Sequence, residues 1–116
     1  MARKPVLTLE DAQRVAAAAE REARANDWKV TIAVVDDGGH LLYLQRGHDT
    51  QFGTVETAIM KAHAAVAFQR PTKASEDAVL SGRLIHLAGT VIGGLGNSGV
   101  RSFQDGQIAA AGAAAL

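Results

Sequence analysis

The stretch VTIAVVDDGGHLLYLQR, residues 30–46, decides the fold of this chain because it predicts two strands joined by a tight turn. Its first half is apolar or small on both alternating faces, which indicates a strand covered on both sides. The Asp-Asp-Gly-Gly segment at 36–39 supplies turn residues, and glycine can adopt positive φ. The stretch therefore predicts an antiparallel β-hairpin with strands at 29–36 and 40–45.

Apolar residues at helical spacing lie on both sides of this hairpin. One helix is expected from a Thr8 cap to residues 26–27, where Asn and Asp end it. A second is expected from a Thr54 cap towards Pro71, which cannot continue a helix, and a short helical turn is expected at 75–77. These helices are predicted to cover the sheet.

The C-terminal part predicts two more strands, at 84–88 and 90–95, then a loop at 96–99. Ser102 is expected to cap a final Ala-rich helix, with Asp105 three positions further on. Consecutive strands with short connections favour antiparallel pairing. The sequence therefore predicts an α+β fold rather than a parallel α/β sheet.

Composition excludes several classes of function. By its length the chain is expected to form one domain, residues 1–116, and a content of 47% hydrophobic and 21% charged residues is typical of a globular protein. Twelve basic and twelve acidic residues cancel, so neither nucleic acid nor an anionic membrane is expected as a partner. The chain has no cysteine, which excludes disulfides and thiolate chemistry. No apolar run approaches the roughly 20 residues of a membrane span, so the expected location is the cytosol.

Histidines and one lysine are the side chains best suited to chemistry near neutral pH. No two histidines have the helical spacing of a metal site, so no metal is expected. His40 follows the hairpin turn and His48 lies in the polar loop after it; each is either a ligand or an ordinary polar residue. Lys61 lies among apolar residues of the second helix. It is either a partly buried cation for an anionic ligand or a surface lysine with a packed stem.

Four stretches, in order along the chain, resemble the haem-degrading (GlcG/HbpS-like) family. They are LTLEDA at 7–12, the hairpin at 30–46, ETAIMKAHAAVAFQRPT at 56–72 and GTVIGGLGNSGVRSFQDGQIAAAGAAAL at 89–116. The resemblance implies a profilin-like three-layer α/β/α sandwich with a central antiparallel sheet of about five strands. It also implies homo-oligomers, from dimers to octamers, and a catabolic-operon or haem-related function.

The chain departs from the family pattern at three places. Residues 47–50 are Gly-His-Asp-Thr where the family usually has Met-Asp-Gly-Ala. Only residues 83–89 stand where the family usually has a longer segment with Gly-Gly-Val-Pro-Ile. Asn97 replaces the usual Val. We expect these changes to cluster near the ligand pocket.

The resemblance implies a small oligomeric protein that binds haem or another small ligand, with haem degradation as a further activity. Arg46, Lys61 and Thr72 are expected to line the pocket. The arginine and the lysine would hold haem propionates, and Thr72 or a histidine such as His40 would contact the iron.

Two alternatives stay open. One is a cofactor-free isomerase or tautomerase of a small-acid or aromatic catabolic pathway. In that enzyme Lys61 and Arg46 would bind a substrate carboxylate, and His48 or Asp49 would move the proton. The other is a non-catalytic accessory oligomer. The sequence therefore does not decide whether the protein is an enzyme.

Overall fold

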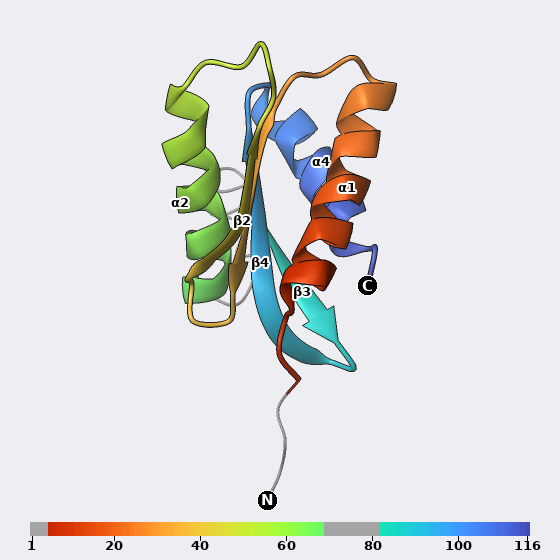
Figure 1. Cartoon of the computed structure of the whole chain (residues 1–116), viewed down its shortest axis with the longest axis vertical. Coiled ribbons are helices and arrows are strands. Elements are labelled where there is room, and N and C mark those ends of the chain that lie inside the picture. The colour runs from red at the N-terminus through yellow and green to blue at the C-terminus, as the bar shows by residue number, and fades with distance from the viewer. Residues whose placement is uncertain (1–4, 69–81) are drawn as a thin grey trace, which may run out of the picture.

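The computed structural model describes residues 5–68 and 82–116, and in these ranges it contains four strands and three helices. Along the chain they are α1 (Leu9–Ala25), β1 (Thr31–Asp36), β2 (Leu41–Arg46), α2 (Gly53–Phe68), β3 (Arg83–Leu87), β4 (Thr90–Ser98) and α4 (Ser102–Ala113). Figure 1 shows three layers, with α2 on one face of the sheet and α1 and α4 on the other. This arrangement confirms the predicted α/β/α sandwich.

The sheet has the strand order β2-β1-β4-β3, and every neighbouring pair is antiparallel. Thr31 pairs with Arg46 of β2 on one side and with Ser98 of β4 on the other. The antiparallel α+β prediction is confirmed. The sheet has four strands in the described residues, whereas about five were expected.

Local sequence signals place the hairpin and the first helix. The Thr8 hydroxyl accepts a hydrogen bond from the Asp11 backbone N–H at 3.1 Å and caps α1, as predicted. In the hairpin turn, one carboxylate oxygen of Asp36 accepts hydrogen bonds from the backbone N–H groups of Gly38 and His40, at 2.9 and 3.0 Å. This carboxylate therefore serves the turn, because a short acidic side chain can replace backbone partners there.

Glycines let α2 lie directly against the backbone of β4. A Cβ at Gly96 would overlap the carbonyl oxygen of Ala58 and the backbone nitrogen of Ala62. A Cβ at Gly94 would lie 2.7 Å from the carbonyl oxygen of Ala62. The close approach buries a small apolar seam between the helix and the sheet, formed by Ala33, Val35, Ala58, Ala62 and Val66.

The predicted loop at 96–99 is wrong in most of its length. Gly96, Asn97 and Ser98 continue β4, and Asn97 pairs with Ile32 of β1. Glycine and asparagine are poor strand formers in isolation, but here the neighbouring β1 completes the backbone hydrogen bonding of the segment. The strand therefore carries Asn97 into the interior.

Two predicted helix caps are also wrong. α2 begins at Gly53, and the Thr54 hydroxyl instead donates to the Gln51 carbonyl oxygen at 2.6 Å. α4 has Arg101 as its N-cap residue, one position before Ser102, and the Arg101 N–H donates to the Gln104 side chain at 3.2 Å. The predicted turn at 75–77 and the end of the second helix at 69–70 lie outside the described residues.

Candidate functional site

Lys61 is a buried cation of α2. It lies on the sheet-facing side of α2, and its side chain is only 4% exposed. Its Nζ donates to a carboxylate oxygen of Asp105 at 2.8 Å and to the backbone carbonyl of Asn97 at 3.0 Å. These two hydrogen bonds join α2 to β4 and to α4.

This ion pair connects the two faces of the sheet, because Lys61 comes from the α2 layer and Asp105 from the α4 layer. The pairing of β3 with β4 starts at Arg83 opposite Leu95, so β3 does not flank the end of β4 beyond Leu95. Gly96 has no side chain there. Lys61 therefore reaches the Asp105 carboxylate beside the part of β4 with which β3 does not pair in the described residues.

Asn97 completes this buried cluster. Its Nδ2 donates to the second carboxylate oxygen of Asp105 at 3.1 Å, and both residues are at most 2% exposed. Burial raises the pKa of the Asp105 carboxyl above its usual value, although the hydrogen bonds and charge of Lys61 and the amide of Asn97 act to lower it. The Oδ1 atom of Asn97 is buried and has no hydrogen-bond partner in the described part of the chain.

The sequence singled out Lys61 and Asn97 but not their common partner. Asp105 was assigned only to the start of the last helix. An available signal was a lone charged residue in the first turn of this helix, where an ionised side chain needs a partner if it is buried. The structure shows Lys61 as an internal cation rather than as a surface lysine.

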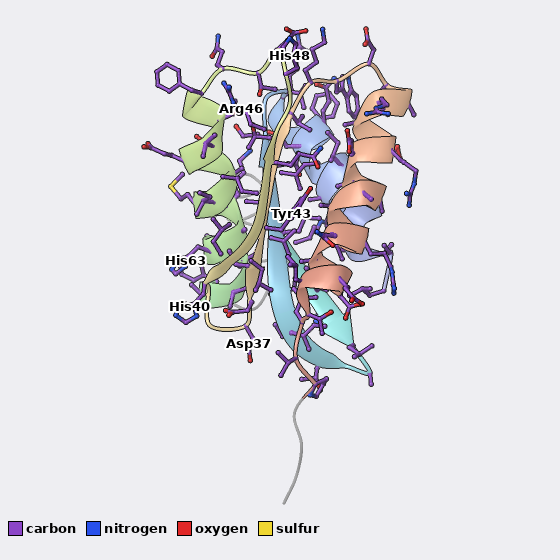
Figure 2. All side chains as sticks on the ribbon, viewed as in Figure 1. Asp37, His40, Tyr43, Arg46, His48 and His63 are labelled. Carbon is purple, nitrogen blue, oxygen red and sulfur yellow. The ribbon has the colours of Figure 1, made fainter. Side chains whose placement is uncertain are left out.

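Arg46 lies at the end of β2, far along the hairpin from the turn (Figure 2). It is exposed, and its guanidinium donates to the Thr50 carbonyl oxygen at 3.3 Å. Because Arg46 pairs with Thr31, whose hydroxyl contacts Thr54 of α2 at 2.7 Å, its side chain belongs to the α2 face.

His48 and Asp49 lie in the loop after Arg46, and both are exposed. His48 Nε2 is 3.9 Å from the Asp49 carboxylate, and Lys29 Nζ forms an ion pair with the same carboxylate at 3.2 Å. His48 and Asp49 are adjacent in the sequence and share this loop, whereas Lys61 is buried against Asp105. The isomerase hypothesis loses its internal lysine as a substrate-binding group.

His40 lies at the opposite end of the hairpin from Arg46 and His48, as Figure 2 shows. Its ring nitrogen Nδ1 is 3.2 Å from the Asp36 carboxylate. Partial burial acts to raise the pKa of Asp36, but hydrogen bonds from the backbone of His40 and Gly38 and from the His40 ring hold this pKa below its usual value. Thr72 lies outside the described residues.

A groove of about 230 Å³ lies between the C-terminal end of α1 and the loop after β2. It contains His48 and Asp49, while Arg46, Lys61 and His40 are absent from its wall. The sequence reasoning missed its other polar and aromatic residues, although Trp28 is the only tryptophan of the chain. The groove is lined by Glu20, Ala23, Arg24, Asp27, Trp28, Lys29, Val30, Ile32, Gln45, Gly47, His48 and Asp49.

Within residues 5–68 and 82–116, no three His, Cys, Asp or Glu side chains are grouped so that they could hold a metal ion. In the same ranges no helix combines the length and the hydrophobicity that a bilayer crossing requires.

Comparison with known proteins identifies relatives along nearly the whole chain. Protein GlcG of Escherichia coli K12 is 38% identical over 108 residues, which cover 93% of this chain and 80% of GlcG. The crystal structure of a double mutant of Streptomyces reticuli HbpS has a TM-score of 0.88 at 30% identity, and the match covers 100% of this chain and 90% of that chain. The crystal structure of a PduOC:heme complex has a TM-score of 0.85 at 28% identity, covering 97% and 96% of the two chains.

The family model described as haem degrading protein HbpS-like matches residues 7–114. This match covers all seven helices and strands in the described residues. The resemblance seen in the sequence motifs is confirmed, and the chain belongs to the HbpS-like family.

Proposed function

We propose that this protein binds haem on the α2-facing side of β2, as a homo-oligomer in the cytosol. The observation that carries the proposal is a strip of exposed apolar side chains that ends at an arginine. Leu41 and Leu44 are 47% and 37% exposed, and Arg46 follows them on the same strand. In the sheet register these three residues pair with Val35, Ala33 and Thr31, respectively.

The residues of this strip fit a porphyrin. Haem requires an apolar surface for its ring and a cation for its propionates. β2 is an edge strand of the sheet in the described residues, so no further strand of that part of the chain pairs with its outer side (Figure 1). The Arg46 guanidinium has one hydrogen bond to a backbone carbonyl and no ion pair in the described residues, which leaves further N–H groups for a propionate.

Further support comes from relatives. A PduOC:heme complex has the same fold over 97% of this chain, and the family description names haem degradation. Bound haem would supply a redox-active iron. In this chain Arg46 would hold a propionate, and Thr72 or His40 would contact the iron. Lys61 would keep α2 and α4 in place, because its two hydrogen bonds are internal.

A titration of the purified protein with hemin tests the proposal. The expected result is a saturable shift of the Soret band at micromolar hemin, weakened by Arg46→Ala and by Thr72→Ala. Arg83→Ala, which removes an exposed arginine from β3 at the other edge of the sheet, is the matched control. Absence of a shift in the wild-type protein would contradict haem binding. Adding hydrogen peroxide to the hemin complex tests degradation. The expected result is that the Soret band of bound hemin bleaches faster than that of free hemin.

Oligomerisation is proposed from large apolar side chains around α2. Met60 and Phe68 are 53% and 62% exposed on the helix, and Phe52, just before it, is 84% exposed. Apolar surface of this kind is typical of a contact with another protein. Light scattering coupled to gel filtration should give a multiple of the 12.1 kDa chain mass, and Met60→Glu should lower it. A wild-type monomer would contradict the proposal.

A further inference from the structure

The groove beside Trp28 is separate from the proposed haem surface. It lies between α1 and the hairpin exit, whereas Leu41, Leu44 and Arg46 are absent from its wall. Its floor includes Val30 and Ile32, which belong to the core on the α1 side of the sheet. A ligand in this groove would therefore contact other residues than haem would.

Trp28 gives this groove an aromatic wall. Its side chain is partly buried and packs against the core cluster, which limits its movement. Its backbone N–H donates to the Ala23 carbonyl oxygen at 2.8 Å, so the residue is also tied to the end of α1. An aromatic ring held in this way can bind a cation over its face without losing much conformational freedom.

The charges around Trp28 leave one carboxylate uncompensated. Arg24 pairs with Glu20 at 2.9 Å, and Lys29 pairs with Asp49 at 3.2 Å, so four of the groove's charges form two neutral pairs. Asp27 forms no ion pair with any described residue and is exposed. With neutral histidine, the groove wall therefore has a net charge of −1.

The position of Asp27 adds to this negative potential. It follows the C-terminal end of α1, where the helix dipole is negative. Its φ is +56°, and the hydrogen bonds from Asp27 N–H to the Arg24 carbonyl and from Trp28 N–H to the Ala23 carbonyl form a Schellman motif. Glycine or asparagine would suit this position better, since neither adds a negative charge to the helix end.

We propose that the groove beside Trp28 binds a small organic cation, such as an alkylammonium or quaternary ammonium compound. The cation lies against the Trp28 ring, and Asp27 provides its counter-charge. This inference does not depend on haem binding, because it uses a different set of residues.

The single tryptophan makes the proposal directly measurable. Choline is added to the haem-free protein at low ionic strength, and the emission of Trp28 is followed. The expected result is a saturable change that disappears when the ammonium nitrogen of choline is replaced by carbon in a neutral isostere. A saturable change with benzoate and none with choline would overturn the proposal, as would no change at millimolar choline.

Asp27→Asn tests the assigned counter-charge. It keeps the shape of the side chain and suits a positive φ, so the fold is retained. The variant should bind choline about tenfold more weakly and melt a few degrees higher than the wild type, because a repulsion at the helix end is removed.

Glu10→Gln is the matched control. It removes one negative charge from the exposed first turn of the same helix, far from the groove. Choline affinity should be unchanged, and the melting temperature should fall slightly because an acidic residue favours the helix start. Equal loss of affinity in both variants would show a general charge effect and contradict the assigned site.

Discussion

Two lysine–aspartate pairs in this molecule have similar geometry and opposite surroundings. Lys61 and Asp105 lie 2.8 Å apart with side chains 4% and 3% exposed, whereas Lys29 and Asp49 lie 3.2 Å apart with side chains 61% and 60% exposed. In the interior neither charge has water as a substitute partner. At the surface water replaces the partner at little cost, so only the interior pair is expected to hold the fold together.

This difference in solvent exposure also decides which of the two pairs can take part in ligand binding. Lys61 lies among apolar residues of the sequence and was therefore a candidate ligand-binding cation. In the structure its Nζ donates to two internal acceptors. Lys29 lies in an unremarkable position of the sequence, yet it lines a groove. An exposed pair can exchange its partner for a ligand, whereas a buried pair cannot do so without unfolding part of the protein.

The largest expected effect comes from breaking the interior pair. Asp105→Ala leaves the Lys61 ammonium buried without its counter-charge and should lower the free energy of unfolding by about 3–5 kcal/mol in urea denaturation. The double variant Lys61→Met with Asp105→Leu removes both charges and should recover most of that loss. A loss below about 1 kcal/mol in the single variant would show that water reaches the site.

The second test examines how closely this interior is packed. Gly96→Ala would place a methyl group against the backbone of α2 at Ala58 and Ala62, so we expect a loss of about 3 kcal/mol. Gly53→Ala is the control, because no atom lies within 4 Å of the added Cβ and the position starts a helix. It should change the free energy of unfolding by less than about 0.5 kcal/mol. Equal effects would contradict the close approach of α2 to β4.

The third test uses pH. Burial raises the pKa of Asp105 in the folded protein, so the folded state binds a proton more readily than the unfolded state. The stability that protonated Asp105 contributes is therefore fully present below the pKa of the unfolded state. This contribution is lost as pH rises through the pKa of the folded state. Relative to Asp105→Asn, the wild type should gain stability in urea as pH falls from neutral towards about 4. The opposite slope would show that Lys61 outweighs burial.

The smallest effect is expected at the surface pair. Asp49→Ala should lower the free energy of unfolding by less than about 0.5 kcal/mol, and added salt should abolish the difference. Urea denaturation at low and high ionic strength measures both quantities. If Asp49→Ala lowered the free energy of unfolding as much as Asp105→Ala does, the exposed pair would stabilise the fold as strongly as the buried pair, and the expected difference between them would be wrong.

Local patterns predicted the secondary structure well, because the interactions that form it are close in sequence. Alternation and the turn residues 36–39 predicted the hairpin, and Thr8 predicted the start of α1. The prediction failed at 96–98, where a glycine-containing segment became strand through pairing with β1. The cap at Ser102 was wrong by one position, because Ser102 is already the first residue of the helix and Arg101, with an extended backbone, is the N-cap.

The candidate site was predicted only in parts. His48 or Asp49 was expected to move a proton, and both residues line the groove beside α1. Of the predicted pocket of Arg46, Lys61 and Thr72, the described residues include two members: Arg46 is exposed at a strand end, and Lys61 is internal. Sequence spacing could not show this, because Lys61 and Asp105 are separated by 44 positions.

By itself the sequence determined the family, the antiparallel hairpin and the amphipathic helices, because these depend on motifs and on periodicity over a few residues. Only the tertiary structure decided the role of each charge. The folding of α2 and α4 onto opposite faces of the sheet buries one lysine–aspartate pair beside Asn97 of β4, whereas another pair stays exposed to water. The physical reason is that the strength of a charge pair depends on its solvent exposure, which a linear sequence does not contain.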